Sequence, residues 1–141
     1  MNQRPSLARC RAVLNSRGVE LWWHAQRWRR IADLALHAKG LSYTEFLVLL
    51  AAYLLEREHG DAVSQQEVVE RLRLPKMTVS DAMRALDDLG CVNRGPEFES
   101  PAFRVFVTPK GRRLLRASMV SFEAVTEHAP AISQKRVLGP T

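Results

Sequence analysis

The 141-residue sequence has few of the features that mark membrane, secreted or disulfide-bonded proteins. Its longest apolar run, residues 46–55, spans ten residues, well short of the ~20 that a membrane helix needs. The N-terminal residues include arginines but no apolar segment with a small-residue cleavage site, so we expect no signal peptide. The two cysteines, Cys10 and Cys91, are too few for a disulfide framework. These absences predict a cytoplasmic protein with no membrane span.

The sequence also has little of what enzymes and cofactor sites require. Its four histidines show no metal-ligand spacing. We find no nucleophile motif, no glycine-rich phosphate loop and no paired-carboxylate constellation. The sequence therefore predicts no enzyme activity, no metal and no cofactor.

What the chain has in excess is positive charge, which is unevenly distributed. The net charge is +6 and the isoelectric point about 10.0, which favours a polyanionic partner. Residues 1–40 hold eight Lys or Arg against two acids (+6), and residues 100–141 hold seven against two (+5). Residues 77–99 hold two against five (−3). The positive charge therefore lies in the flanks, where its main carriers are Arg4, Arg9, Arg11, Arg17, Lys110, Arg112 and Arg113.

The chain divides into a basic, weakly structured arm (1–16), one domain (17–128) and a C-terminal tail (129–141). Apolar residues recur at three- or four-residue spacing over 17–38, which predicts a helix. Ser42 with Glu45 forms a capping box for a second helix, to about residue 58. Residues 62–63 have the pattern of a very short strand.

The second half of the domain has equally clear helix boundaries. Ser64 with Glu67 forms a second capping box, and Pro75 suits the first turn of a helix over 76–89. Strands follow at 91–94 and 103–107, and a last helix runs from Thr108 and Pro109 to about residue 127. The order is helix, helix, strand, helix, helix, strand, strand, helix. This order predicts a mainly α fold with a small β-hairpin wing, the winged helix-turn-helix, which usually places one helix in the DNA major groove.

Two stretches of this region have a distinctive order of residues: VVERLRLPKMTVSDAMRALDDLGCVNR (residues 68–94) and VFVTPKGRRLL (residues 105–115). On these residues the chain, over about 42–116, resembles the MarR family of bacterial transcriptional regulators. It implies a homodimer that reads double-stranded DNA, with the helix over 76–89 in the major groove and the wing at the minor groove. The DNA contacts that we expect from it are Lys76, Met77, Thr78, Ser80, Asp81, Arg84, Arg94, Arg104, Lys110 and Arg112.

Two features depart from the family pattern. Its wing commonly has an acid-x-Arg pair, for which this chain has Glu99 and Pro101, so the acid is kept and the arginine is lost. The family also continues into a long dimerisation helix, whereas here a short tail containing Pro130 follows. With the negative charge of residues 77–99, these departures leave a rival reading open, in which the winged helix is an anti-repressor or adaptor that binds a protein.

Several candidate residues have an ordinary alternative role. Arg84 suits a bidentate bond to guanine, worth about 1–3 kcal/mol of discrimination, or an ion pair with Asp81, worth about 0.2–0.5 kcal/mol. For Asp81 we favour this pairing over a bond from a cytosine amine. Thr78 and Ser80 suit bonds to phosphate or bases, but also an ordinary helix start.

Aromatic residues gather in the first two predicted helices. They could line a pocket for a small aromatic effector, which the resemblance implies, or serve the core and the dimer interface, which we favour. The residues are Trp22, Trp23, Trp28, Tyr43 and Phe46. Because Trp22 and Trp23 are adjacent in a helix, at least one of them must face another chain, a ligand or solvent.

Overall fold

The computed structural model describes residues 3–94 and 104–131, in which most helices begin at a side-chain hydroxyl. A Ser or Thr caps α1 (Leu7–Leu14), α2 (Arg17–His37), α3 (Tyr43–His59), α4 (Gln65–Leu72) and α6 (Pro109–Thr126). Both predicted capping boxes, at Ser42 and Ser64, are confirmed. Helix α5 (Lys76–Asp88) is different, because its N-cap is Pro75 and no side chain caps it. Pro75 was expected inside the first turn and instead precedes it.

The predicted β-hairpin is present, and the short strand near residue 63 joins it to form one sheet of three strands. Strands β1 (Val63–Ser64), β2 (Val92–Arg94) and β3 (Arg104–Val107) are antiparallel in the order β1-β3-β2. Val63 lies opposite Val105, and Val92 lies opposite Val107. These four valines are at most 4% exposed, so one face of the sheet belongs to the core. The predicted wing tip, with Glu99 and Pro101, lies outside the described residues, and so does Phe103, the predicted start of the second wing strand.

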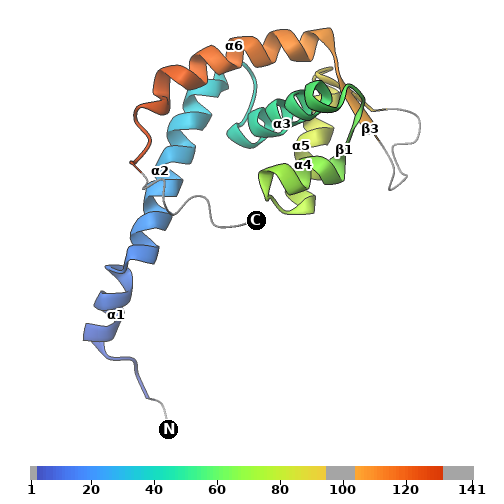
Figure 1. Ribbon diagram of the computed structural model, residues 1–141. Helices are drawn as coiled ribbons and strands as arrows, with labels where there is room; N and C mark the ends of the chain where they lie inside the picture. Colours follow the sequence, from blue (N-terminus) through green and yellow to red (C-terminus); the bar gives the residue numbers. More distant parts are fainter. Residues whose placement is uncertain (1–2, 95–103, 132–141) are drawn as a thin grey trace.

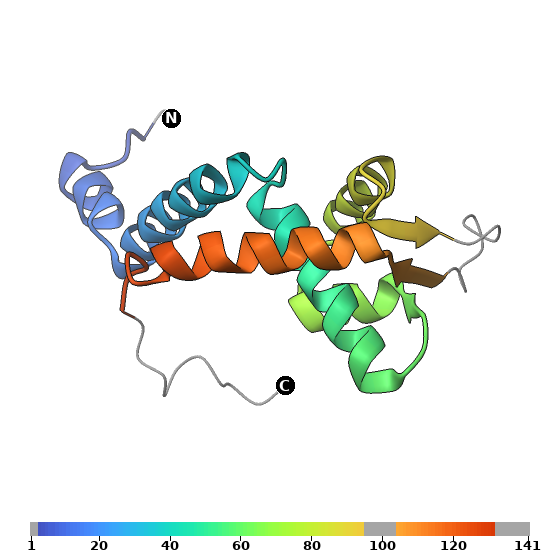
Figure 2. The same ribbon diagram turned by 90° about the horizontal axis from the view of Figure 1, so that it is seen from above.

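Helix α3 lies at the centre of the domain. Its buried residues include Phe46, Val48, Leu49 and Ala52, each at most 1% exposed. It packs against α2, α4, α5, α6 and the sheet. Helix α6 runs across α2 and α3, as Figures 1 and 2 show from two directions. The predicted mainly α winged helix-turn-helix is therefore confirmed. None of the described helices combines the length and the apolarity that a membrane span requires.

The N-terminal arm is more ordered than expected. Instead of weakly structured chain, the structure has helix α1, which Ser6 caps and which projects away from the wing end of the domain (Figure 1). No residue of α1 is buried, and Leu7 and Val13 are 72% and 62% exposed. The sequence pattern did not reveal α1 because that pattern records burial, and this helix buries nothing within its own chain.

A close backbone approach joins the wing to α6 at Gly111. Thr108 donates its hydroxyl hydrogen bond to the Gly90 carbonyl oxygen (2.6 Å) and accepts one from the Gly111 N–H (3.0 Å). The Thr108 N–H donates to the Cys91 carbonyl oxygen at 3.0 Å. Gly111 is buried against that same carbonyl group, and a Cβ on it would overlap the Cys91 carbonyl oxygen. The T-x-x-G sequence at 108–111 therefore has a steric cause.

We expect Gly111→Ala to destabilise the fold by roughly 3 kcal/mol or more, because the added methyl collides with backbone rather than with a movable side chain. Gly18→Ala is the matched control. It adds a methyl where no atom lies within 4 Å, and should stabilise α2 by about 0.5–1 kcal/mol. Urea unfolding monitored by circular dichroism measures both. Equal stability of the two variants would contradict the proposed close packing.

Candidate nucleic-acid interface

Helix α5 separates a buried face from an exposed face, as its sequence predicted. Val79, Ala82, Met83 and Leu86 are at most 5% exposed and face the core. The opposite face presents Met77 (66% exposed) with Asp81 and Arg84, whose side chains are 67% and 56% exposed. Lys76 is exposed at the first turn, and Thr78 and Ser80 are half-buried. An exposed α5 face of this kind can enter a major groove without disturbing the core.

The N-terminus of α5 is open. The first N–H groups of a helix have no partner within it, and here no side chain caps them. Lys76 is the first residue of the helix, and Arg73 lies in the preceding turn with an exposed side chain. Backbone N–H groups, the helix dipole and two cations together form a surface suited to a phosphate. Sequence analysis did not include Arg73, although a cation directly before the Leu-Pro turn could have been recognised from the sequence.

Arg73 also has an unusual backbone. It ends α4 in the left-handed region with φ 55°, as the only non-glycine residue with positive φ among those described. This conformation is rare for a residue with a Cβ and marks a tight turn. The turn sets the angle between α4 and α5, and so it aims the exposed face of α5.

The predicted pairing of Asp81 with Arg84 is confirmed. Arg84 Nη1 lies 3.4 Å from Asp81 Oδ1, across one turn of α5. Both side chains are more than half exposed, so the pair contributes little to folding. The pair presents one positive and one negative group to whatever binds the exposed face.

The wing arginines are engaged with the protein. Arg94 Nη2 lies 2.9 Å from Asp87 Oδ2, and the Arg94 side chain is only 15% exposed. Arg104 donates from Nη1 to the Ala62 carbonyl oxygen at 3.0 Å, which ties β3 to the start of β1. In this conformation both guanidinium groups hold the wing to the domain. Their predicted phosphate contacts remain predictions.

A half-buried carboxylate, which sequence analysis did not identify, also supports the wing. Glu56 on α3 accepts a hydrogen bond from the Val107 N–H of β3 at 2.9 Å. This bond joins residues 51 positions apart, which no local pattern reveals. The bond fixes β3 against the central helix.

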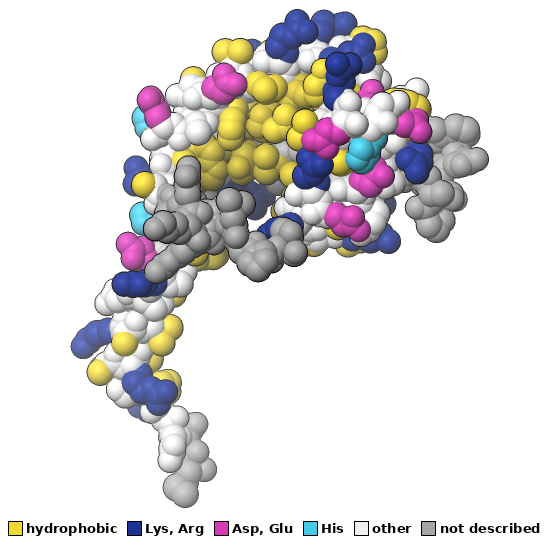
Figure 3. All heavy atoms as spheres, viewed as in Figure 1, with side chains coloured by type: hydrophobic (Ala, Val, Ile, Leu, Met, Phe, Trp, Pro, Cys, Tyr) yellow, Lys and Arg dark blue, Asp and Glu magenta, His cyan; other side chains and the backbone are white. Residues whose placement is uncertain are grey.

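The cations of α6 lie at its first turns. Lys110 approaches Gly90, at the end of α5, and its charge acts on the Cys91 thiol. Arg112 donates from Nη1 to the Val107 carbonyl oxygen at 3.3 Å, and Arg113 is exposed. Figure 3 shows dark blue side chains gathered along the top of the view, where α6 lies. The start of α6 is thus a basic surface that adjoins the C-terminal end of α5.

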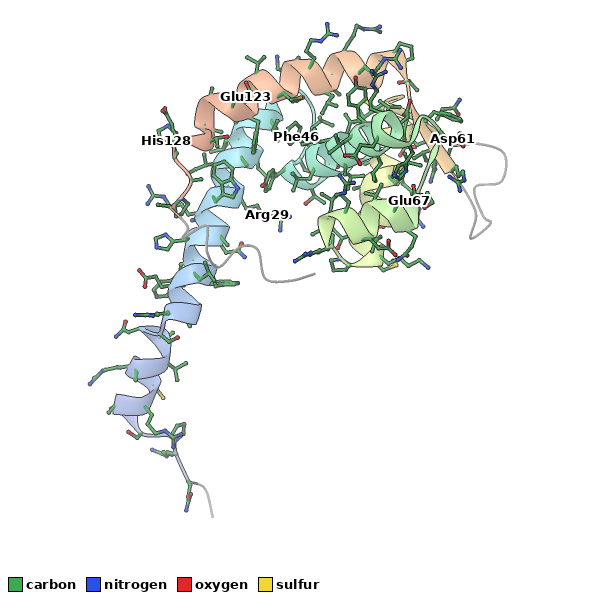
Figure 4. All side chains as sticks on the ribbon, in the orientation of Figure 1. Arg29, Phe46, Asp61, Glu67, Glu123 and His128 are labelled. Carbon is green, nitrogen blue, oxygen red and sulfur yellow. The ribbon has the colours of Figure 1, made fainter. Side chains whose placement is uncertain are left out.

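Three of the five candidate aromatic residues pack together. Trp28 donates from Nε1 to the Tyr43 hydroxyl at 3.2 Å, and Phe46 lies in the core at 1% exposed. Phe122 of α6, which sequence analysis did not include, contacts all three rings at centroid distances of 5.1–6.0 Å. This cluster joins α2, α3 and α6, as the position of Phe46 in Figure 4 illustrates. A packing role in the core therefore accounts for these residues.

Trp22 and Trp23 are not in that cluster. They are 58% and 51% exposed, so both, rather than one, lie outside the core of the chain.

An open polar hollow of about 280 Å³ separates α2 and the start of α3 from α5. Arg29, labelled in Figure 4, lines it on the α2 side, and Thr78 and Asp81 line it on the α5 side.

Within residues 3–94 and 104–131, no three His, Cys, Asp or Glu side chains converge as metal ligands would.

Comparison with known proteins is consistent with this geometry. No protein-family model matches the chain. Among curated proteins, it is similar to the uncharacterized HTH-type transcriptional regulator YdcH of Bacillus subtilis (strain 168). The two are 26% identical over 122 residues, which cover 84% of this chain and 74% of YdcH.

Several solved structures also resemble the chain. The transcriptional regulator MosR of M. tuberculosis matches with a TM-score of 0.70 at 22% identity, over 87% of each chain. A MarR-family regulator from Rhodococcus sp. RHA1 matches with a TM-score of 0.66 at 20% identity, over 95% of this chain and 89% of that one. The fold of the chain is therefore the winged helix-turn-helix of the MarR-type regulators.

The two thiols should differ sharply in reactivity. Cys10 is exposed on α1, whereas Cys91 is buried, and burial raises the pKa of the Cys91 thiol while nearby Lys110 opposes that rise. Since the thiolate is the reactive species, we expect Cys10 alone to react with DTNB in the native protein, and Cys91 only after unfolding. Cys10→Ser provides the control, with no rapid thiol. Two rapidly reacting thiols in the native protein would contradict the placement of Cys91.

Proposed function

We propose that this chain, which has the fold of the MarR-type regulators, is a sequence-specific double-stranded DNA-binding transcriptional regulator that acts in the cytoplasm as a homodimer. Helix α5 enters the major groove and reads bases with its exposed face. The observation that carries the proposal is this face itself, with an uncapped helix N-terminus beside Arg73 and Lys76. MosR, one of the similar structures, has also been solved in complex with DNA.

Phosphate contacts supply most of the affinity, as in other DNA-binding proteins. Arg84 and Arg94 add little net charge, because Asp81 and Asp87 balance them. The contribution therefore falls on cations that form no ion pair with an acid among the described residues. Beside α5 these are Arg73, Lys76 and Lys110, followed by Arg112 and Arg113 on α6.

The arginines of the N-terminal arm have a different position. Helix α1 lies at the opposite end of the molecule from the wing strands in both Figures 1 and 2. Arg9 and Arg11 of α1 are therefore remote from α5 of their own chain. The predicted contribution of the arm to DNA affinity, which also involves Arg4 and Arg17, remains a prediction.

The homodimer rests on apolar side chains that the single chain leaves exposed. On α2, Trp22, Trp23 and Leu34 are 58%, 51% and 78% exposed, and on α6 Val120 is 67% exposed. Figure 3 shows hydrophobic side chains gathered where α6 lies over α2 and α3. Large aromatic and aliphatic side chains of this kind dominate protein interfaces, and their burial favours association.

The aromatic residues considered for an effector site fall into two groups. The cluster of Trp28, Tyr43 and Phe46 is engaged in packing with Phe122. Trp22 and Trp23 suit the dimer interface as well as a ligand. A small aromatic effector therefore remains a prediction from the family resemblance.

The first experiment tests DNA binding through its salt dependence. We expect the logarithm of affinity for duplex DNA, measured by fluorescence polarisation, to fall steeply with the logarithm of salt concentration. The double variant Arg73→Ala, Lys76→Ala should weaken binding to all sequences alike. It should also reduce the magnitude of the slope by roughly 2, one for each lost phosphate contact.

The matched control is the double variant Arg27→Ala, Arg30→Ala, which removes the same charge from exposed positions of α2. It should leave the slope unchanged. A flat salt dependence, or no binding of any duplex at micromolar protein, would overturn the proposal and favour the rival protein-binding adaptor.

The second experiment tests the dimer. Trp22→Glu and Val120→Glu each place a charge on the apolar surface, so we expect dissociation to monomers at micromolar concentration, measured by sedimentation velocity. Phe106→Glu is the control, because Phe106 is 50% exposed but lies on β3, at the wing end of the domain. If both the α2 variant and the α6 variant remain dimeric, the interface does not involve these apolar side chains, which would contradict the proposed dimer.

A further inference from the structure

Two oppositely charged side chains share the centre of the exposed α5 face. Asp81 and Arg84 are 67% and 56% exposed and are joined by one contact, Arg84 Nη1 to Asp81 Oδ1 at 3.4 Å. Asp88 is also exposed, and lies four residues after Arg84, a spacing at which helix side chains can pair. The structure pairs Arg84 with Asp81 instead.

We propose that Asp81 is a specificity-determining residue that acts by positioning Arg84. The inference rests on the proposed DNA-binding function and assigns a role to a residue whose charge opposes binding to a polyanion. In this role, Asp81 lowers the affinity for most DNA sequences, but not for the few whose base edges form hydrogen bonds with both side chains. Specificity then comes from the repulsion of wrong sequences by Asp81 as well as from the attraction of Arg84 to the right ones.

The contact leaves Arg84 equipped to read a base. A guanidinium group has five N–H donors in a planar fork, and Asp81 engages it through Nη1. Nη2 and Nε remain for the O6 and N7 acceptors of guanine, the commonest specific contact in the major groove. Because Asp81 restricts the rotamers of a long side chain, Arg84 is directed to one position instead of sampling nearby phosphates.

The charge of Asp81 supplies the discrimination. A carboxylate on a DNA-facing surface is repelled by phosphates and by the acceptor atoms O6, N7 and O4 of the bases. The groups that it accepts bonds from are the amines of cytosine and adenine. The two residues together therefore favour a guanine at Arg84 with an amino group next to it at Asp81.

Folding gives no competing explanation for the pair. Both side chains are more than half exposed and three residues apart on one helix, and such pairs contribute little to stability. Asp81→Asn keeps the shape of the side chain and removes only its charge. The variant should therefore fold as the wild type does, and its effects should appear in DNA binding alone.

The test compares Asp81→Asn with Asp88→Asn. Both remove one exposed negative charge from α5, seven residues apart and hence on the same side of the helix. The probes are duplexes selected from a random pool by the wild-type protein, and random duplex of the same length. Polarisation titrations at one salt concentration give the ratio of the two affinities for each protein.

We expect Asp81→Asn to bind random duplex more tightly and to lower the ratio by roughly tenfold, the size of one base discrimination. Asp88→Asn should raise both affinities alike and keep the ratio. Single base-pair changes in the selected duplex should show Asp81→Asn and Arg84→Ala losing discrimination at the same or adjoining positions.

Equal ratios for Asp81→Asn and Asp88→Asn would overturn the inference, since the effect would then be one of general charge. Loss of discrimination at unrelated positions in the two variants Asp81→Asn and Arg84→Ala would overturn it as well. The failure of the proposed function looks different, because then the wild-type protein itself binds no duplex.

Discussion

Burial of helix α3 is the constraint on which the other elements depend. Its side chains contact α2, α4, α5, α6 and the sheet, so each of these elements is positioned against one common surface. A polar bond adds to the apolar contacts, from the Val107 N–H to Glu56. Because protein cores are close-packed, an element placed against α3 has little freedom to shift. The exposed face of α5 is thus held at a fixed orientation relative to the wing and to the start of α6.

Around α5, electrostatic balance matters more than total charge. The chain carries +6 overall, yet Asp81 and Asp87 of α5 offset Arg84 and Arg94, the arginines nearest the exposed face. Such an arrangement weakens general attraction to a polyanion at the exposed face of α5, which we propose reads the bases. Attraction is left to the uncapped helix N-terminus, with Arg73 and Lys76, and to α6. In the proposed complex with DNA, affinity and selectivity would come from separate residues of one surface.

Local features were predictable from the sequence, and tertiary ones were not. The capping boxes at Ser42 and Ser64, the two faces of α5 and the pairing of Asp81 with Arg84 all involve residues within a few positions of each other. The order of the predicted helices and strands was also enough to predict the fold.

The features that sequence reasoning missed either join segments far apart in the chain or bury no side chain. Glu56 meets Val107 across 51 positions, and Phe122 reaches Trp28 from the last helix. Helix α1 escaped notice because it buries no side chain in its own chain. The left-handed conformation of Arg73 was also not predictable, because the residue that usually ends a helix in this conformation is a glycine or an asparagine.

The close approach at Gly111 has a geometrical consequence for the proposed homodimer. Helix α6 starts at this junction and continues for 18 residues, about 27 Å at 1.5 Å per residue. One end is locked to the wing and the other carries apolar side chains toward the proposed partner chain. In the proposed homodimer, α6 would therefore be a rigid connection of fixed length and rotation between the partner chain and the DNA. The spacing of two half-sites on a duplex, about one helical turn apart in related architectures, would then be set by this rigid connection rather than by flexible chain.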